Sequence, residues 1–294
     1  MILENKDCLE YLKTLDSKSV DLVLVDPPYF GIVDNEWDNQ WPTEFGYLGW
    51  CEQWTKECTR VLKDNRMLVV WGTLKTDTFL NYKLNILNKI DSLESQTEII
   101  WHYNWGGRTK SNFARKSELA WCYSKGKDFI FNADDVRVER KITSDMNKGK
   151  KLLEEYKNKF KKEHGEEPSK EQIKNYRKEH IDPVIEFPKG TIPTNVWDYT
   201  NVWKYQNHTA SKEHCGWHPT TKNLDVLERI IKAYTNTGDT VLDCFSGSGS
   251  TMIAAAKAGR KFTGCEIDKD YFEKSKERFE NLVSMADRFS LDNE

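Results

Sequence analysis

Four consecutive residues in the first tenth of the chain have the types needed to hold an amino group. Asp26, Pro27, Pro28 and Tyr29 directly follow a nearly continuous apolar run at residues 20–25. The two prolines remove two backbone donors, so the turn presents acceptors: the Asp26 carboxylate and the peptide carbonyls. Tyr29 adds a flat aromatic face beside them. The pattern favours an amine held between these acceptors and a ring, and the alternative is a turn that only ends a strand.

A glycine-bearing turn in the last third of the chain is typical of a nucleoside site. A predicted strand at residues 240–243 ends in Asp243 and is followed by Cys244, Phe245, Ser246, Gly247, Ser248 and Gly249. A predicted helix at 250–258 and a strand at 261–266, ending in Glu266, complete a βαβ unit. An acidic residue there can accept both hydroxyls of a ribose. The alternative is a tight turn that binds nothing.

Two details of this turn disfavour a dinucleotide. The third glycine of the dinucleotide fingerprint is replaced by Met252. The strand also brings the carboxylate of Asp243 to the loop, where a pyrophosphate would need backbone amides and a helix dipole. A carboxylate suits a ligand with a positive end, such as an amino acid. S-adenosylmethionine combines adenosine, an amino acid and a sulfonium, and we expect it here.

Strands and helices alternate along most of the chain, which predicts an α/β fold. The apolar runs at 20–25 and 67–71 are typical of strands buried on both faces of a parallel sheet. Further strands are expected at 97–102, 119–123 and 129–131, and helices at 48–62, 76–90 and 223–234, with a loop at 30–49. We expect the strand tips at Asp26 and Gly247 to meet at one edge of the sheet.

The composition changes between residues 137 and 189, which hold 15 basic and 11 acidic residues. Leu152, Leu153, Tyr156 and Phe160 mark one face of a helix, and Ser169 with Gln172 fits a capping box that opens a second helix. We expect a catalytic core at 1–132 and 196–294, and a helical insertion at 133–195 that forms part of a target-recognition region. The alternative is a solvated helical spacer.

These motifs, in this order, resemble the β class of amino-methylating DNA methyltransferases. Asp26 to Tyr29 matches the catalytic motif of that family, residues 243–249 match its cofactor loop, and Glu266 matches its ribose-binding acid. Residues 217–222, Trp-His-Pro-Thr-Thr-Lys, match its HPTxK stretch. Asn5-Lys6-Asp7 lies where the family has Gly-Asp, and Ser117 to Trp121 resembles the segment before its recognition region.

The resemblance implies a Rossmann-like S-adenosylmethionine-dependent methyltransferase sheet with a circularly permuted motif order. It implies methyl transfer to the exocyclic N6 amine of a flipped adenine in double-stranded DNA. Asp at position 26 resembles adenine-directed members, and serine is more common in cytosine-directed ones. The alternatives are a cytosine-N4 enzyme, an RNA or protein-amide methyltransferase, and a binding module without activity.

The resemblance also implies site residues and partners. The catalytic residues would be Asp26, Pro27, Pro28 and Tyr29, with no part for a thiol. The cofactor-binding residues would be Asp7, Thr220, Lys222, Asp243, Cys244, Phe245, Ser246, Gly247, Gly249 and Glu266. A homodimer and a cognate restriction endonuclease are the further partners implied.

A basic stretch with aromatic neighbours is predicted to lie near the DNA backbone. It contains Arg108, Lys110, Arg115 and Lys116, and the alternative is a solvated loop. The group His208, His214, Cys215 and His218 fits no standard zinc spacing, so no metal is expected.

The composition sets the remaining limits. The chain has 294 residues, 38% of them hydrophobic, and a mean hydropathy of −0.75. No run approaches the roughly 18 apolar residues of a membrane helix, so we expect a cytoplasmic protein without a membrane partner. An odd number of cysteines, seven, indicates reduced thiols. The formal charge of −3 means that any contact with nucleic acid needs a local basic surface.

Overall fold

The chain divides into two compact units in the computed structural model, which describes residues 1–32, 34, 36–73, 76–102, 110–111, 113, 116–138, 144–181, 192–198 and 215–291. The first unit comprises Met1–Val136 and Thr194–Glu294, and the second is Arg137–Pro193. No helix in these described ranges is both long enough and apolar enough to cross a bilayer.

The first unit is built on an eight-stranded sheet of order β1-β8-β7-β2-β3-β5-β4-β6. Its strands are β1 (Ile2–Asn5), β2 (Val20–Val25), β3 (Leu62–Gly72), β4 (Glu94–His102), β5 (Ser117–Ser124), β6 (Val196–Asp198), β7 (Thr240–Asp243) and β8 (Lys261–Glu266). β5 runs antiparallel to β3 and β4, and the other neighbouring strands are parallel. The predicted Rossmann-like α/β fold is confirmed.

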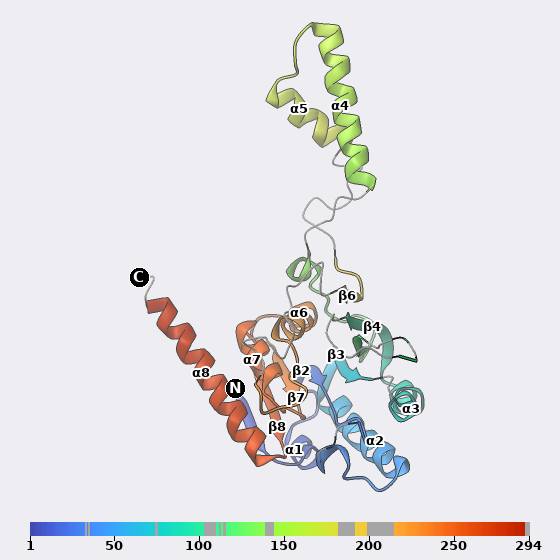
Figure 1. The fold of residues 1–294 in the computed structure, drawn as a ribbon, viewed down its shortest axis with the longest axis vertical. Coiled ribbons are helices and arrows are strands. Elements are labelled where there is room, and N and C mark those ends of the chain that lie inside the picture. The colour runs from blue at the N-terminus through green and yellow to red at the C-terminus, as the bar shows by residue number, and fades with distance from the viewer. Residues whose placement is uncertain are drawn as a thin grey trace. The chain divides into compact units, whose positions relative to one another are not determined.

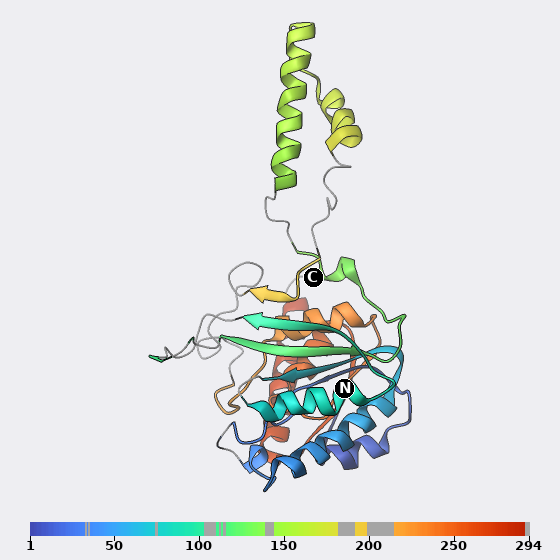
Figure 2. The same ribbon diagram turned by 90° about the vertical axis from the view of Figure 1, so that its right-hand side faces the viewer.

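Helices cover both faces of this sheet (Figures 1 and 2). α1 (Cys8–Thr14), α2 (Glu44–Val61) and α3 (Asp77–Asn85) pack on one face, and α6 (Leu224–Tyr234), α7 (Ser250–Lys257) and α8 (Lys269–Leu291) on the other. Successive strand residues point to opposite faces. In β2, Leu22 and Leu24 therefore join the α6–α7 core, while Val23 and Val25 join the α1–α2 core. This double burial explains the apolar run without polar alternation.

The order of the strands places β2 beside β7, with Leu22 opposite Val241 and Val23 opposite Leu242. From β7 the chain continues through α7 to β8 on one side, and from β2 through α2 to β3 on the other. Open α/β sheets bind ligands in the crevice at such a switch point, outside the carboxyl ends of the strands. Asp26 and Asp243 both lie at this point.

Two sequence predictions are wrong at the level of single elements. The expected strand at 129–131 is not a strand, because Phe129 and Phe131 pack their rings against Tyr234 of α6, at centroid distances of 6.4 and 5.9 Å. The expected loop at 30–49 contains a 3-10 helix, η1 (Glu36–Asp38), and the start of α2. α2 begins at Glu44 because the Thr43 hydroxyl accepts from the Gly46 amide.

The second unit is a pair of helices, α4 (Ser144–His164) and α5 (Lys170–Tyr176), followed by a π-helical turn, η4 (Arg177–Ile181). The rings of Tyr156 and Tyr176 stack at 4.0 Å and 10°. The capping box of Ser169 and Gln172 is confirmed, with both reciprocal hydrogen bonds formed. Short 3-10 helices in the first unit are η2 (Leu87–Lys89) and η3 (Ala133–Val136).

Candidate active site

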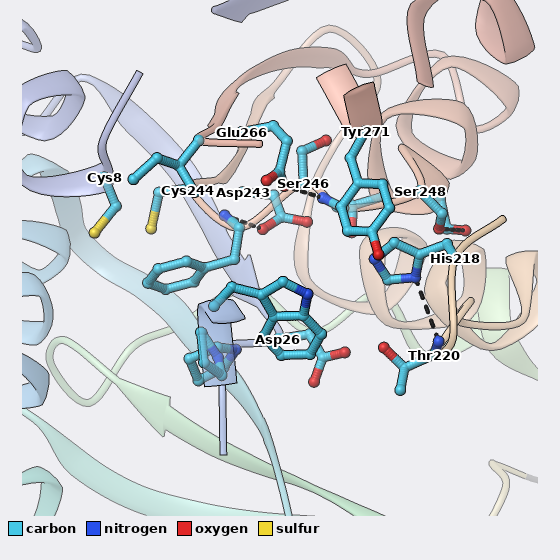
Figure 3. Close-up of a pocket in the computed structure, with 18 of the residues that line it drawn as sticks. Cys8, Asp26, His218, Thr220, Asp243, Cys244, Ser246, Ser248, Glu266 and Tyr271 are labelled. Atoms are coloured by element: carbon cyan, nitrogen blue, oxygen red, sulfur yellow. Dashed lines mark hydrogen bonds between the residues drawn. The ribbon is translucent and has the colours of Figure 1, made fainter. Parts of the chain in front are cut away.

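The two motifs that are far apart in the sequence open onto one cavity at the switch point. Asp26, Pro27, Pro28 and Tyr29 line it together with Asp243, Cys244, Phe245, Ser246, Gly247 and Glu266. Figure 3 shows Asp26 across the cavity from Glu266, with His218 and Thr220 along one edge. The expectation that the two strand tips meet is confirmed.

A buried aspartate, Asp38, shapes the backbone after the turn at residues 26–29. Both oxygens of the Asp38 carboxylate accept backbone N–H groups, from Tyr29 and Ile32 at 2.6 Å each and from Phe30 at 3.0 Å. Phe30 has a φ of +64°, a region that side chains with a Cβ rarely adopt. The hydrogen bonds to the Asp38 carboxylate therefore stabilise a backbone conformation that is itself unfavourable. They also fix the position of the Tyr29 backbone. Sequence reasoning missed Asp38, because no period or spacing marks it.

Each oxygen of the Asp26 carboxylate has its own partner. The Tyr29 hydroxyl donates to Oδ1, and Lys222 Nζ donates to Oδ2 at 2.5 Å. The same ammonium lies 3.2 Å from a carboxylate oxygen of Glu118 on β5. Burial alone would lower the pKa of Lys222, but the carboxylates of Asp26 and Glu118 outweigh it and raise the pKa above its ordinary value. Lys222 is thus an ammonium at neutral pH.

Aromatic neighbours hold the rest of the turn at residues 26–29. Tyr47 donates its hydroxyl to the Pro28 carbonyl at 2.7 Å, and the Tyr29 ring meets Phe79 edge-on at 5.0 Å. Burial, and then the Asp26 carboxylate, raise the pKa of Tyr29 well above its usual range. Tyr29 is therefore a neutral hydroxyl that can donate, and the Pro28 carbonyl is already engaged.

The glycine loop has positions that only glycine fills without strain. Gly247 has a φ of +48°, and a Cβ built on it would lie 2.7 Å from His218 Nε2. Gly249, at φ +74°, is the N-cap of α7, and it is not among the residues that line the cavity, although its neighbours Ser248 and Ser250 are. The absence of a side chain at Gly247 therefore lets the His218 ring lie against the backbone of the loop.

Two carboxylates stand at the carboxyl ends of β7 and β8. The Glu266 carboxylate accepts from the amides of Gly247 at 2.7 Å and Asp268 at 2.9 Å, and Asp243 accepts from the Phe245 amide at 3.0 Å. Burial raises the pKa of Asp243 to about 7 and raises that of Glu266. Carboxylate oxygens accept more than one hydrogen bond, so both can still bind hydroxyl or amine donors.

His218 has a defined tautomer at the edge of the cavity. Its Nδ1 accepts from the Thr220 amide at 3.3 Å, which places the proton on Nε2, the nitrogen beside Gly247. Burial lowers the pKa of His218 to about 4, and its ring packs on Tyr271 at 4.8 Å. A neutral imidazole therefore lies against the backbone of Gly247, and both residues line the cavity.

The cavity suits an adenosyl amino acid by its donors and acceptors. Ser246 Oγ is buried without a hydrogen-bond partner, although its residue lines the cavity. A buried hydroxyl without a partner is costly, and a polar ligand would satisfy it. Glu266 supplies an acceptor for hydroxyls, Asp243 an acceptor for an amine, and Trp50 and Phe245 supply aromatic surface, with their rings 5.5 Å apart.

The remaining predicted residues fall into three groups. Asp7 lines the cavity and also caps α1, accepting from the amides of Leu9 and Glu10, and Thr220 lines the cavity as well. Of the predicted DNA contacts, Lys110 is exposed and Lys116 half-buried. Arg108 and Arg115 lie outside the described residues.

The zinc alternative receives no support from the described ranges, where no group of three or more histidine, cysteine or acidic side chains could hold a metal ion. His208 and His214 lie outside those ranges.

Comparison with known proteins identifies the family. The model of the DNA methylase family N6_N4_Mtase matches residues 20–277. Type II methyltransferase M.HpaI of Haemophilus parainfluenzae is 27% identical over 94% of this chain and 73% of its own length. DNA adenine methyltransferase YhdJ of Escherichia coli strain K12 is 29% identical over 91% of this chain and 78% of its own length. The chain belongs to this DNA methylase family and is an S-adenosylmethionine-dependent DNA methyltransferase.

Solved structures agree on the fold. The cytosine-N4-specific PvuII DNA methyltransferase is similar with a TM-score of 0.63 at 18% identity, covering 94% of this chain and 85% of its own. The M1.HpyAVI–SAM complex has a TM-score of 0.54 at 20% identity and covers 94% and 98%. One neighbour in fold therefore methylates cytosine N4, and one relative in sequence is an adenine enzyme.

Proposed function

We propose that the chain methylates the exocyclic N6 amine of adenine in double-stranded DNA, at a base turned out of the helix. The observation that carries the proposal is the Asp26 turn facing the Gly247–Glu266 cavity across a shared space. An amine placed beside Asp26 would lie next to a ligand held at Gly247. Adenine is favoured over cytosine because the carboxylate of Asp26 stands where cytosine-directed relatives more commonly have serine.

Methyl transfer needs the amine nitrogen to present its lone pair. S-adenosylmethionine, when bound, supplies an electrophilic methyl group on a sulfonium sulfur. In adenine the lone pair of the amino group is delocalised into the ring, so the amine is a poor nucleophile. The Asp26 carboxylate and the Pro27 carbonyl accept its hydrogens and favour a pyramidal nitrogen. Alignment and electrostatic preorganisation then supply much of the rate.

The resting hydrogen bond of Tyr29 implies an exchange on substrate entry. The Tyr29 hydroxyl occupies Asp26 Oδ1, the oxygen that is not held by Lys222. When the amine takes this oxygen, Tyr29 is released and its ring becomes available to stack on the base. Stacking returns about 1–3 kcal/mol, against a cost of a few kcal/mol for turning a base out of the duplex.

Product analysis tests the choice of base. Plasmid DNA from a host without DNA methylation is incubated with the protein and methyl-labelled S-adenosylmethionine, then digested to nucleosides. N6-methyladenine as the labelled product supports the proposal. N4-methylcytosine as the labelled product would instead make the protein a cytosine-N4 methyltransferase, as its structural neighbour from PvuII is. Label in RNA or protein but not in DNA would contradict the proposal.

A substitution tests the role of Asp26. Asp26→Ala removes the acceptor without touching Gly247 or Glu266, so we expect methyl transfer to fall at least about 100-fold while affinity for S-adenosylmethionine is kept. Asp64→Ala, at an exposed carboxylate on the same unit, is the control and should transfer normally. A near-normal transfer rate in Asp26→Ala would overturn the role.

A further inference from the structure

Lys222 makes its close contacts in the cavity with acidic side chains. Its Nζ lies 2.5 Å from Asp26 Oδ2 and 3.2 Å from Glu118 Oε2, and 5.4 Å from the centre of the Trp71 ring. Its side chain is 9% exposed, whereas those of Asp26 and Glu118 are 21% and 28% exposed. An ammonium taken out of water in this way is held by its two carboxylates.

The two oxygens of Asp26 therefore differ in how easily they exchange partners. Oδ2 is bound by a buried cation that is itself anchored to β5 through Glu118. Oδ1 is bound by a neutral hydroxyl, that of Tyr29, on a loop beside the cavity. Both bonds end on the ionised carboxylate, but only the Lys222 bond joins two opposite charges, which adds their Coulomb attraction. An incoming amine displaces the Tyr29 hydroxyl far more readily than the Lys222 ammonium.

We propose that Lys222 and Glu118 are positioning residues for Asp26: they hold Oδ2 and so reserve Oδ1 for the target amine. This inference rests on the proposed function. It also gives Lys222 a role different from cofactor binding. The third member, Glu118, attaches the ammonium to the sheet, so the carboxylate of Asp26 is oriented by the strand β5 as well as by its own turn.

The titratable groups around Asp26 identify the substitutions that test the inference. In the described part of the chain, the titratable groups that face Asp26 are Tyr29 on its own turn, Lys222 and His218 on the segment before α6, and Asp243 on β7. Glu118 faces Lys222 from β5. His218 is neutral above about pH 4 because burial lowers its pKa, so Lys222 is the cation closest to Asp26.

Removal of the ammonium should slow the transfer step and leave cofactor binding in place. Lys222→Met frees Asp26 Oδ2, so the carboxylate is no longer fixed, and we expect the single-turnover transfer rate to fall by about 10- to 100-fold. Glu118→Gln keeps Lys222 on Asp26 but detaches the ammonium from β5, so we expect a smaller fall in the same rate. Lys222→Arg keeps the charge and a donor for Oδ2, and it should restore most of the wild-type rate.

The experiment measures single-turnover methylation of unmethylated plasmid DNA with saturating S-adenosylmethionine, alongside the dissociation constant of S-adenosylmethionine by calorimetry. The matched control is Lys83→Met, at a lysine of α3 that pairs with Glu98 and lies over the Trp121 ring. It should leave the transfer rate unchanged. The dissociation constants of all variants should stay within about threefold of wild type, well under the tenfold that 1.4 kcal/mol represents.

Several outcomes would overturn the inference. A tenfold loss of cofactor affinity in Lys222→Met with an unchanged transfer rate at saturation would make Lys222 a cofactor ligand. A transfer rate in Lys222→Arg as low as that in Lys222→Met would indicate general damage to the site. If Lys222→Met fails to fold, an unchanged transfer rate in Glu118→Gln is sufficient to reject the inference. Absence of any methyl transfer by the wild-type protein would contradict the proposed function instead.

Discussion

At the scale of single residues, the site is a set of carboxylates that differ in their neighbours. Asp26 is paired with a cation, Asp243 is buried and accepts from the Phe245 amide, and Glu266 accepts from the Gly247 and Asp268 amides. Under the proposed function, the same residue type would serve an amine, an amino acid and a ribose. Sequence reasoning indicated these three positions because each carboxylate lies at or directly after the end of a strand.

Replacement of Glu266 should affect binding and not chemistry. Glu266→Gln keeps the shape but removes the charge that would accept ribose hydroxyls, and a hydrogen bond to a charged group contributes about 1.5–3 kcal/mol. We therefore expect S-adenosylmethionine to bind roughly 10- to 100-fold more weakly, measured by calorimetry, with the transfer rate at saturation little changed. Glu273→Gln, at an exposed residue of α8, should bind normally. Unchanged affinity in Glu266→Gln would refute the ribose role.

At the scale of elements, the sequence predicted the strands and turns whose burial produces a recognisable pattern of apolar residues or glycines. β2 and β3 were expected because both of their faces are buried, and the loop at 243–249 because glycine and a strand end coincide. β6 has three residues and no period, so nothing in the sequence marked it. Glu118 lies in the segment that resembles the one before the family's recognition region, so its position was noted. Its contact with Lys222 could not be predicted, because it depends on β5 lying beside β3 in the folded sheet.

The turn that follows Pro28 depends on one side chain of η1. Asp38→Ala would leave the amides of Tyr29, Phe30 and Ile32 without their acceptor, and we expect the free energy of unfolding to fall by about 3 kcal/mol. The transfer rate should fall as well, because the backbone of Tyr29 loses the hydrogen bond that fixes its position. Cofactor affinity should be unchanged. Urea unfolding and single-turnover methylation measure the two effects.

A neighbouring aspartate provides the comparison for this turn. Asp34→Ala, in the same loop but exposed, should change neither stability nor rate. Equal stability of Asp38→Ala and Asp34→Ala would show that the hydrogen bonds of Asp38 do not hold the loop.

At the scale of the whole molecule, the net charge of −3 gives no overall attraction to DNA, so the distribution of charge determines where DNA can bind. Residues 137–189 hold four more basic than acidic residues, so the rest of the chain is about −7. Several lysines of the second unit already pair with glutamates, such as Lys161 with Glu167. Electrostatic attraction to DNA must therefore come from local groups of basic residues.

The salt dependence of DNA binding separates the two candidate groups, the basic stretch near Lys110 and the second unit. Each lysine or arginine that neutralises a phosphate contributes about 0.9 to the slope of log K against log salt. We expect Arg108→Ala with Lys110→Ala to lower the magnitude of that slope by about 2. Lys148→Ala with Lys150→Ala should lower it by a similar amount if α4 contacts DNA, and leave it unchanged if the second unit is a solvated spacer.

The comparison needs an exposed lysine that belongs to neither group. Lys56→Ala on α2, whose Nζ pairs with Glu52 at 2.6 Å, meets that condition and should keep the wild-type slope. Equilibrium binding to an unmethylated duplex at several salt concentrations gives all three slopes. A slope unchanged in Arg108→Ala with Lys110→Ala would remove the basic stretch from the phosphate contacts. A slope lowered equally by all three sets would mean that net charge, and not a placed surface, controls binding.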